Sequence, residues 1–433
     1  SIVLDRDDNP YLVFESLNAK GEPLEQSDLI RNFFFMHIHV EQQEEVYSTL
    51  WLPMQRMLGD RLTEFIRHFL MKDGGMVKKD NVYFTLKDRA NNKTTDEIIL
   101  YLEEIVKFST YYKKILHPEQ ESNEGICRGL ERLNRLDVTT AYPFLLNCYA
   151  DYDSEFLSAE DFIEILNIIE NFIIRRFVCN IPTNQLNKIF PGLYAQGVRD
   201  ENNLISGIKS ILQTKGYPKD EEFIKRLEDI QLYGSGDRAT KAKLILESFE
   251  EYFGHKETVS FDNLTIEHIM PQTITEWWQQ HLGEDWEVTH ELYIHTLGNL
   301  TLTGYNAELS NGTFYQKKEY LKQSHLQINK YFSELEQWNR DEIEKRSDYL
   351  AVQALKIWPY FGDDISKPLV KNITHSKPVR LIILGQEFGV KTWRDVMEQT
   401  LNIIDEIDPD QFKEIIPRFP QFVGVNGEKS RGS

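Results

Sequence analysis

Glu267 and His268 are the adjacent side chains of this sequence whose types best suit acid–base and metal chemistry. They follow residues 264–266, a short β-prone run, and precede Met270 and Pro271, where the proline ends the strand. We therefore expect both side chains on a rigid turn at the end of a strand. Alone, such a pair is a weak indication, because in most proteins it is a surface ion pair.

A second strand and a helix are expected after this pair. Residues 300–303 alternate leucine with threonine, which is the two-residue period of a strand. Residues 306–323 predict an asparagine-rich loop that leads into a lysine-bearing helix. Asn299 directly precedes the second strand, and the turn preference of asparagine alone would make it a turn cap.

The residue types in these elements match the requirements of phosphodiester hydrolysis. That reaction needs a general base for the attacking water and a divalent cation that neutralises charge on the phosphate. His268 suits the base, because an imidazole titrates near neutral pH. Glu267 and an asparagine at the helix start supply the hard oxygen ligands that Mg²⁺ or Mn²⁺ prefers. Asn306 and Asn311 both fall there; spacing does not choose between them, and we place Asn306 ahead.

The order strand, strand, helix resembles the ββα arrangement of the HNH nucleases. The segment from Glu267 to Lys318 is similar to the C-terminal HNH domain of the GmrSD-type, modification-dependent (type IV) restriction endonucleases. In that family Asn299 corresponds to the middle asparagine, which bridges the strands and fixes the loop that carries the base. The residues that match the family motif are His268, Pro271, Gly298 to Leu302, Asn306, Leu309, Ser310, Asn311 and Lys317.

The resemblance implies an endonuclease that cuts double-stranded DNA, defending a bacterium against phage DNA with modified bases or a modified backbone. His268 and Asn299 would be its catalytic residues, and Glu267, Asn306 and Asn311 its metal ligands. A catalytically silent DNA-binding or regulatory module with a degenerate HNH fold is the competing hypothesis. An RNA nuclease would use the same site.

Composition agrees with a globular protein and bears on its partners. The chain has 433 residues, a formal net charge of -20 and 41% hydrophobic residues. This acidity argues against coating nucleic acid by bulk electrostatics, although a metal would screen an acidic active site. Cys127, Cys148 and Cys179 lie far apart, so we expect neither disulfides nor a structural zinc. No signal peptide is present, and charges interrupt the apolar residues 162–178. We therefore expect a cytoplasmic protein that does not contact membranes. A homo-oligomer is compatible with the sequence.

The first residues resemble the end of the GmrS-like (ParB/sulfiredoxin-like) domain of the same family. The resemblance rests on residues 11–24 and 27–32, read as a strand, a turn and a helix capped by Ser27. The Asp-Gly-Gln-Gln-Arg hallmark of that domain is absent, so we interpret the chain as a fragment. A nucleotide triphosphate would be a cofactor only with the missing N-terminal domain present.

Charged residues on the expected helices have competing interpretations. Residues 128–135 and Arg175-Arg176 could touch phosphate or form solvated helix faces, and we favour the latter. In residues 161–172, Glu164 and Glu170 are expected on the outer face of an amphipathic helix. His295 is interpreted as a packing residue rather than a ligand. Lys317, Lys318 and Lys322 either meet DNA phosphate or form a solvated face, and Lys317 and Lys318 are our predicted phosphate contacts.

We therefore predict a mainly α fold with an embedded ββα-metal (HNH, His-Me finger) nuclease unit and a small C-terminal α+β module. In that module we expect a β-hairpin in residues 379–390 and a helix in residues 393–407. The predicted divisions are residues 1–32 (tail of a truncated GmrS-like domain), 33–254 (helical scaffold), 255–330 (nuclease), 331–370 (helical connector) and 371–433 (C-terminal module).

Overall fold

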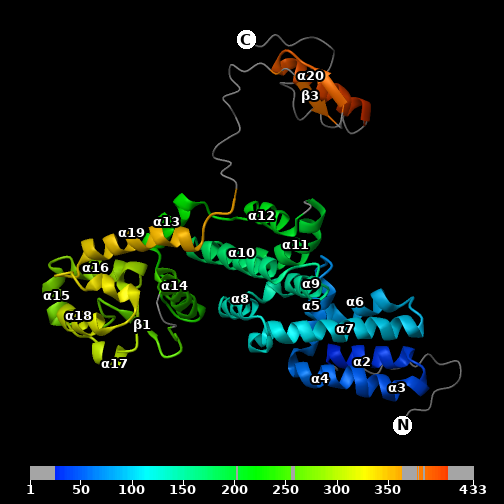
Figure 1. The fold of residues 1–433 in the computed structure, drawn as a ribbon, viewed down its shortest axis with the longest axis horizontal. Coiled ribbons are helices and arrows are strands. Elements are labelled where there is room, and N and C mark those ends of the chain that lie inside the picture. The colour runs from blue at the N-terminus through cyan, green and yellow to red at the C-terminus, as the bar shows by residue number, and fades with distance from the viewer. Residues whose placement is uncertain are drawn as a thin grey trace. The chain divides into compact units, whose positions relative to one another are not determined.

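The computed structural model describes residues 25–200, 203–254, 259–362, 378, 380–383 and 386–407 (Figure 1). These residues are mainly helical with two small sheets, as the sequence predicts. The chain divides into two compact units, Ser1–Phe361 and Gly362–Ser433. No helix in the described ranges combines the length and the apolar character needed to cross a membrane.

Helices make up the described part of the first unit from Gln26 to Phe253. Thr94 and Glu97 form a reciprocal capping box at the start of α7, and Ser158 caps α10 through the backbone N–H of Asp161. The helices are α2(Gln26–His37), α3(Val40–Val46), α4(Leu52–Leu58), α5(Leu62–Met71), α6(Val82–Ala90), α7(Thr95–Leu116), α8(Glu124–Arg135), α9(Tyr142–Asp153), α10(Ala159–Val178), α11(Leu186–Asp200), α12(Leu204–Gln213), α13(Asp220–Asp229) and α14(Asp237–Phe253), with a π-helical turn η1(Tyr47–Trp51) and 3-10 turns η2(Gly59–Arg61), η3(Lys79–Asn81), η4(Pro118–Gln120), η5(Thr139–Ala141) and η6(Thr183–Gln185).

The predicted cap at Ser27 is wrong. The helix begins two residues earlier than that cap implies, at Gln26, because Glu25 adopts the extended conformation of the N-cap residue. Ser27 therefore lies inside the first turn. The predicted strand and turn in residues 11–24 lie outside the described residues.

Helix α10 is buried on nearly all sides, which corrects three predictions of solvated charges. Arg175 and Arg176 are buried and donate to backbone carbonyls, including those of Trp358 and Lys215. Glu170, expected outside, is also buried and accepts a hydrogen bond from the indole of Trp358. The charges are tolerated because each one has hydrogen-bond partners inside the core.

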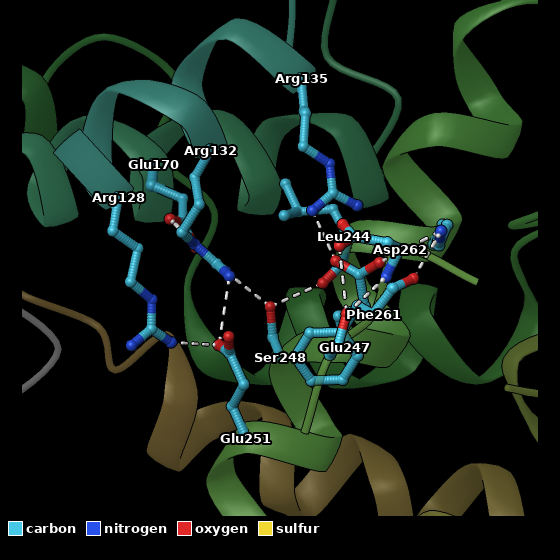
Figure 2. Close-up of polar contacts among 12 residues, drawn as sticks. Arg128, Arg132, Arg135, Glu170, Leu244, Glu247, Ser248, Glu251, Phe261 and Asp262 are labelled. Atoms are coloured by element: carbon cyan, nitrogen blue, oxygen red, sulfur yellow. Dashed lines mark hydrogen bonds and ion pairs between the residues drawn. The ribbon is translucent and has the colours of Figure 1, made fainter. Parts of the chain in front are cut away.

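Ion pairs of its arginines join helix α8 to α14 and α10, with Arg132 largely buried and Arg128 exposed (Figure 2). Arg132 donates to both oxygens of Glu170 at 2.6 and 2.7 Å and to the hydroxyl of Ser248. Arg135 pairs with Glu247 at 2.5 Å, and Arg128 pairs with Glu251 at 2.6 Å. These contacts hold α14 against α8. Helix α14 directly precedes the first strand in the sequence.

The first sheet is the strand pair that the sequence predicts. β1(Thr265–His268) pairs antiparallel with β2(Leu300–Thr303), with His268 opposite Leu300. Between them lie α15(Glu276–Leu282), α16(Trp286–Tyr293) and the 3-10 turn η7(Leu297–Asn299). After β2 come α17(Asn306–Leu309), α18(Phe314–Gln323), the 3-10 turn η8(Gln327–Phe332) and α19(Arg340–Ile357).

A separate apolar cluster supports this region. Its members come from the turn after β1, from α15, from the end of α16 and from the segments after β2, with Trp278 and Trp338 as its largest side chains. The indole of Trp278 donates to the carbonyl of Gly312 at 3.0 Å. The loop between α17 and α18 is thereby tied to the insertion between the strands.

The second unit contains the predicted β-hairpin and helix. β3(Arg380–Ile383) pairs antiparallel with β4(Gln386–Gly389), and α20(Trp393–Ile407) follows. Both predictions are confirmed.

Candidate functional site

Glu267 and His268 lie at the end of β1, as predicted, and both are buried with about 5% of their surface exposed. Burial is the main cause that lowers the pKa of His268 to about 3, with smaller contributions from the nearby His295, Lys317 and His290. The imidazole is therefore neutral near pH 7. A neutral imidazole has one nitrogen lone pair with which to accept a proton, but a pKa this far below neutral makes His268 a weaker base than the sequence predicts.

Three side chains surround the His268 ring. Its Nε2 lies 3.0 Å from Nδ1 of His295, and its Nδ1 lies 3.3 Å from Nε2 of Gln272. The ring of Tyr233 stands edge-on to it, with ring centroids 4.8 Å apart. His295, which the sequence suggested was only a packing residue, thus contacts the candidate base directly.

Asn299 connects the loop that follows β1 to the start of β2. Its Oδ1 accepts hydrogen bonds from the backbone N–H of Met270 at 2.8 Å and from the indole of Trp338 at 3.0 Å. Its Nδ2 donates to the carbonyls of Met270 and Ile294, each at 3.0 Å. Fully buried and bonded at every polar atom, Asn299 fixes the turn beside His268 and does more than cap a turn.

Glu267 forms a buried ion pair with Lys317 of α18. Nζ of Lys317 lies 2.5 Å from Oε1 of Glu267 and donates to the carbonyl of His268 at 2.7 Å. Burial raises the pKa of Glu267 while Lys317 opposes the rise, and burial likewise lowers the pKa of Lys317. The ammonium does not face solvent, so a contact with DNA phosphate requires Lys317 to leave Glu267.

The other predicted residues follow β2, in α17, in the turn after it and in α18. Asn306 is the first residue of α17, which packs beside β1, and Asn311 lies in the turn before α18; both are exposed. Lys318 is half-buried and donates to the carbonyl of Leu335, and exposed Lys322 pairs with Glu319. The predicted phosphate contact of Lys318 stays a prediction.

The donors at this site suit a hard cation. Within the described residues, no cluster of three or more His, Cys, Asp or Glu side chains could hold a metal ion. The side chains of Asn306 and Asn311 carry amide oxygens, the other donor type that the sequence predicts for this site. Carboxylate and amide oxygens are suitable ligands for Mg²⁺ or Mn²⁺, so these residue types fit the cation that the sequence predicts.

Arg346 of α19 is a positioning residue that sequence analysis missed. Its Nη1 donates to the carbonyls of Gly298 and Leu300 at 2.7 and 2.6 Å, and burial lowers its pKa to about 9. Gly298 lies so close to α19 that an added Cβ would stand 2.2 Å from the carbonyl oxygen of Ile343. This close approach explains the glycine that precedes Asn299.

Fold and site together describe a helical protein with a buried histidine and carboxylate at the end of a two-stranded sheet. Residues 217–353 match a family model described as GmrSD restriction endonucleases, C-terminal domain. This match confirms the resemblance of this part of the chain to the C-terminal domain of that family. The matched segment contains every predicted site residue, whereas residues 1–32 lie outside it. No curated protein matches the chain.

Proposed function

We propose that the chain is a metal-dependent endonuclease of the HNH type that hydrolyses phosphodiester bonds in double-stranded DNA. The observation that carries the proposal is the burial of Glu267 and His268 at the end of β1, within residues that match a restriction-endonuclease domain. The two strands and the following helices α17 and α18 would form its ββα-metal unit.

In this proposal His268 accepts a proton from the water that attacks phosphorus. Asn299 keeps the imidazole in place, because it fastens the turn at Met270 to the start of β2. Glu267, with Asn306 or Asn311, would hold Mg²⁺ or Mn²⁺. The cation would neutralise charge on the phosphate and on the leaving oxygen.

Lys317 would act on the carboxylate. Its ammonium keeps Glu267 ionised in a buried position, where an unpaired carboxylate would favour protonation. Binding of a cation of higher charge at Glu267 would compete with Lys317. Release of the lysine would free it for the phosphate contact that the sequence predicts, together with Lys318.

The biological role that we infer follows from the family. A modification-dependent restriction endonuclease would act in the bacterial cytoplasm on phage DNA that carries modified bases or a modified backbone. The matched domain supports restriction and DNA as the substrate. Recognition of the modification is a proposal that a panel of modified and unmodified DNA would test.

A catalytically silent DNA-binding or regulatory module is the second candidate. It is favoured by the ion pair that occupies Oε1 of Glu267 and by the small exposed fraction of His268. Such a module would bind DNA without cutting it. An RNA nuclease with the same residues would instead cut only RNA.

Nicking of supercoiled plasmid separates these candidates. The assay compares the wild type in Mg²⁺, in Mn²⁺ and in chelator, with RNA of matching sequence as a second substrate. His268→Ala is the test variant, and His325→Ala, which alters an exposed histidine of the same domain, is the matched control. We expect metal-dependent nicking that only His268→Ala abolishes. Binding without nicking in either metal would support the silent module.

A further inference from the structure

The side chain of His295, which is not part of the matched motif, contacts the His268 imidazole. We propose that His295 is a positioning residue that selects the tautomer of His268, so that Nδ1 is the nitrogen that accepts the proton. This inference rests on the proposed function for its catalytic consequence. Its structural part, the tautomer, can be tested without any cleavage.

The two nitrogens of His268 have different surroundings. Nε2 is occupied by His295 Nδ1 at 3.0 Å, and only one of these two nitrogens can carry the shared proton. Nδ1 has the longer contact of 3.3 Å, to Nε2 of exposed Gln272, which donates to it and would have to move aside for a water. If Nε2 were the unprotonated nitrogen, its lone pair would point at His295 and could not reach a water.

A base at this position therefore requires the proton on Nε2. Nε2–H then donates to His295 Nδ1, and the lone pair of Nδ1 receives a proton from the water. The imidazole becomes an imidazolium while the water oxygen forms the new bond to phosphorus. The P–O ester bond on the opposite side breaks, its electron pair leaves with the alcohol oxygen, and that oxygen takes a proton from solvent. The hydrogen bond to His295 strengthens as positive charge develops on His268, since charge-assisted hydrogen bonds are the stronger ones.

The backbone places His295 independently of its side chain. Its carbonyl accepts hydrogen bonds from the N–H groups of Leu232 and Tyr233, at 2.8 and 3.3 Å. The Tyr233 ring then lies against both imidazoles, with centroids 4.8 Å from His268 and 5.4 Å from His295. A substitution of the His295 side chain should leave this loop in place, which makes a clean test feasible.

The direct test is ¹⁵N NMR of the histidine side chains in the full chain near neutral pH. The signals of His268 are assigned by their loss in His268→Ala. We expect the Nε2–H tautomer in the wild type and a mixture of tautomers in His295→Phe, which keeps a ring but has no acceptor. The Nδ1–H tautomer in the wild type, or an unchanged tautomer in His295→Phe, would overturn the proposal whether or not the chain cuts DNA.

The kinetic test compares His295→Phe with His295→Asn in single-turnover cleavage. The Oδ1 atom of asparagine can take the place of the Nδ1 acceptor of histidine. Loss of an orienting partner typically costs about 10- to 100-fold in activity. We expect that loss in the maximal single-turnover rate constant for His295→Phe, with no change in the enzyme concentration that gives half the maximal rate. In His295→Asn the rate constant should recover to within a few fold of the wild-type value. Equal losses in both variants would contradict a role through the acceptor.

Discussion

Replacing Asn299 with alanine should destabilise the domain strongly, because this side chain joins three separate parts of it. The substitution leaves four polar groups without their partner: N–H and C=O of Met270, C=O of Ile294 and the indole N–H of Trp338. All of them belong to residues that are buried, so water cannot readily replace the lost amide.

The expected cost follows from these four bonds. A buried hydrogen bond contributes about 1 kcal/mol net, and more when the remaining partner is left unsatisfied, so Asn299→Ala should lose about 4 kcal/mol of unfolding free energy. In a domain of this size each kcal/mol lowers the melting temperature by roughly 2 °C, which gives a fall of about 8 °C. Asn311→Ala, an exposed asparagine of the same motif, is the matched control and should change stability by less than about 0.5 kcal/mol.

Thermal and urea unfolding of the full chain, followed by circular dichroism, measures both variants. Asn299→Asp sharpens the comparison, because it keeps the Oδ1 acceptor and loses both bonds donated by Nδ2. It should be at least as unstable as Asn299→Ala, since a carboxylate oxygen would face the carbonyls of Met270 and Ile294. A loss below about 1 kcal/mol in Asn299→Ala would refute the bridging role.

Three further predictions concern the surroundings of the site. Lys317→Met should cost about 3–5 kcal/mol by leaving Glu267 buried and unpaired, and adding Glu267→Gln should restore much of that loss; additive effects would refute the pairing. Burial holds the pKa of His268 at about 3 and that of buried His68 at about 4, below the unfolded value of 6.5. Between these values the unfolded chain binds protons that the folded chain does not, so the free energy of unfolding is highest above pH 6.5 and falls as the pH drops. The free energy of unfolding, measured with urea, should fall between pH 6.5 and 4 by on the order of 3 kcal/mol less in His68→Gln than in the wild type. The same dependence on pH in both proteins would contradict this prediction. Gly298→Ala should lower the free energy of unfolding by about 1–3 kcal/mol, because the added Cβ would force η7 away from α19. An unchanged midpoint of urea unfolding would contradict this prediction.

The two strands could be predicted because local patterns encode them, whereas the bridging position of Asn299 was implied by the family resemblance. The alternation of leucine and threonine predicts β2, and Pro271 ends β1 where His268 lies. The hairpin and helix of the second unit follow from equally local signals. The extent of each strand and helix depends on its own few residues, although the pairing of β1 with β2 joins segments about thirty residues apart.

Buried charges were missed where the sequence did carry a signal. Phe314, Lys317 and Leu321 share the spacing of one helix face, so Lys317 lies on the apolar face of α18. Arg175 and Arg176 likewise interrupt a run of apolar residues in α10. A charge on such a face needs a partner in the core, which in α18 is Glu267.

The contacts of His295 could not be predicted from local pattern. They depend on the loop at Leu232 and Tyr233, which meets His295 only after the helices have packed. Arg346 is similar, because its carbonyl partners lie on an earlier turn of the chain. Such residues appear only when the tertiary structure brings distant segments together.

Single-turnover cleavage of end-labelled double-stranded DNA in Mg²⁺ by the wild type and by His268→Ala tests the central claim most directly. Removal of a general base typically slows a reaction by about 100- to 10,000-fold. We predict a fall of that size in His268→Ala with DNA binding unchanged. A His268→Ala cleavage rate within a few fold of the wild-type rate would contradict the assignment of His268 as the base.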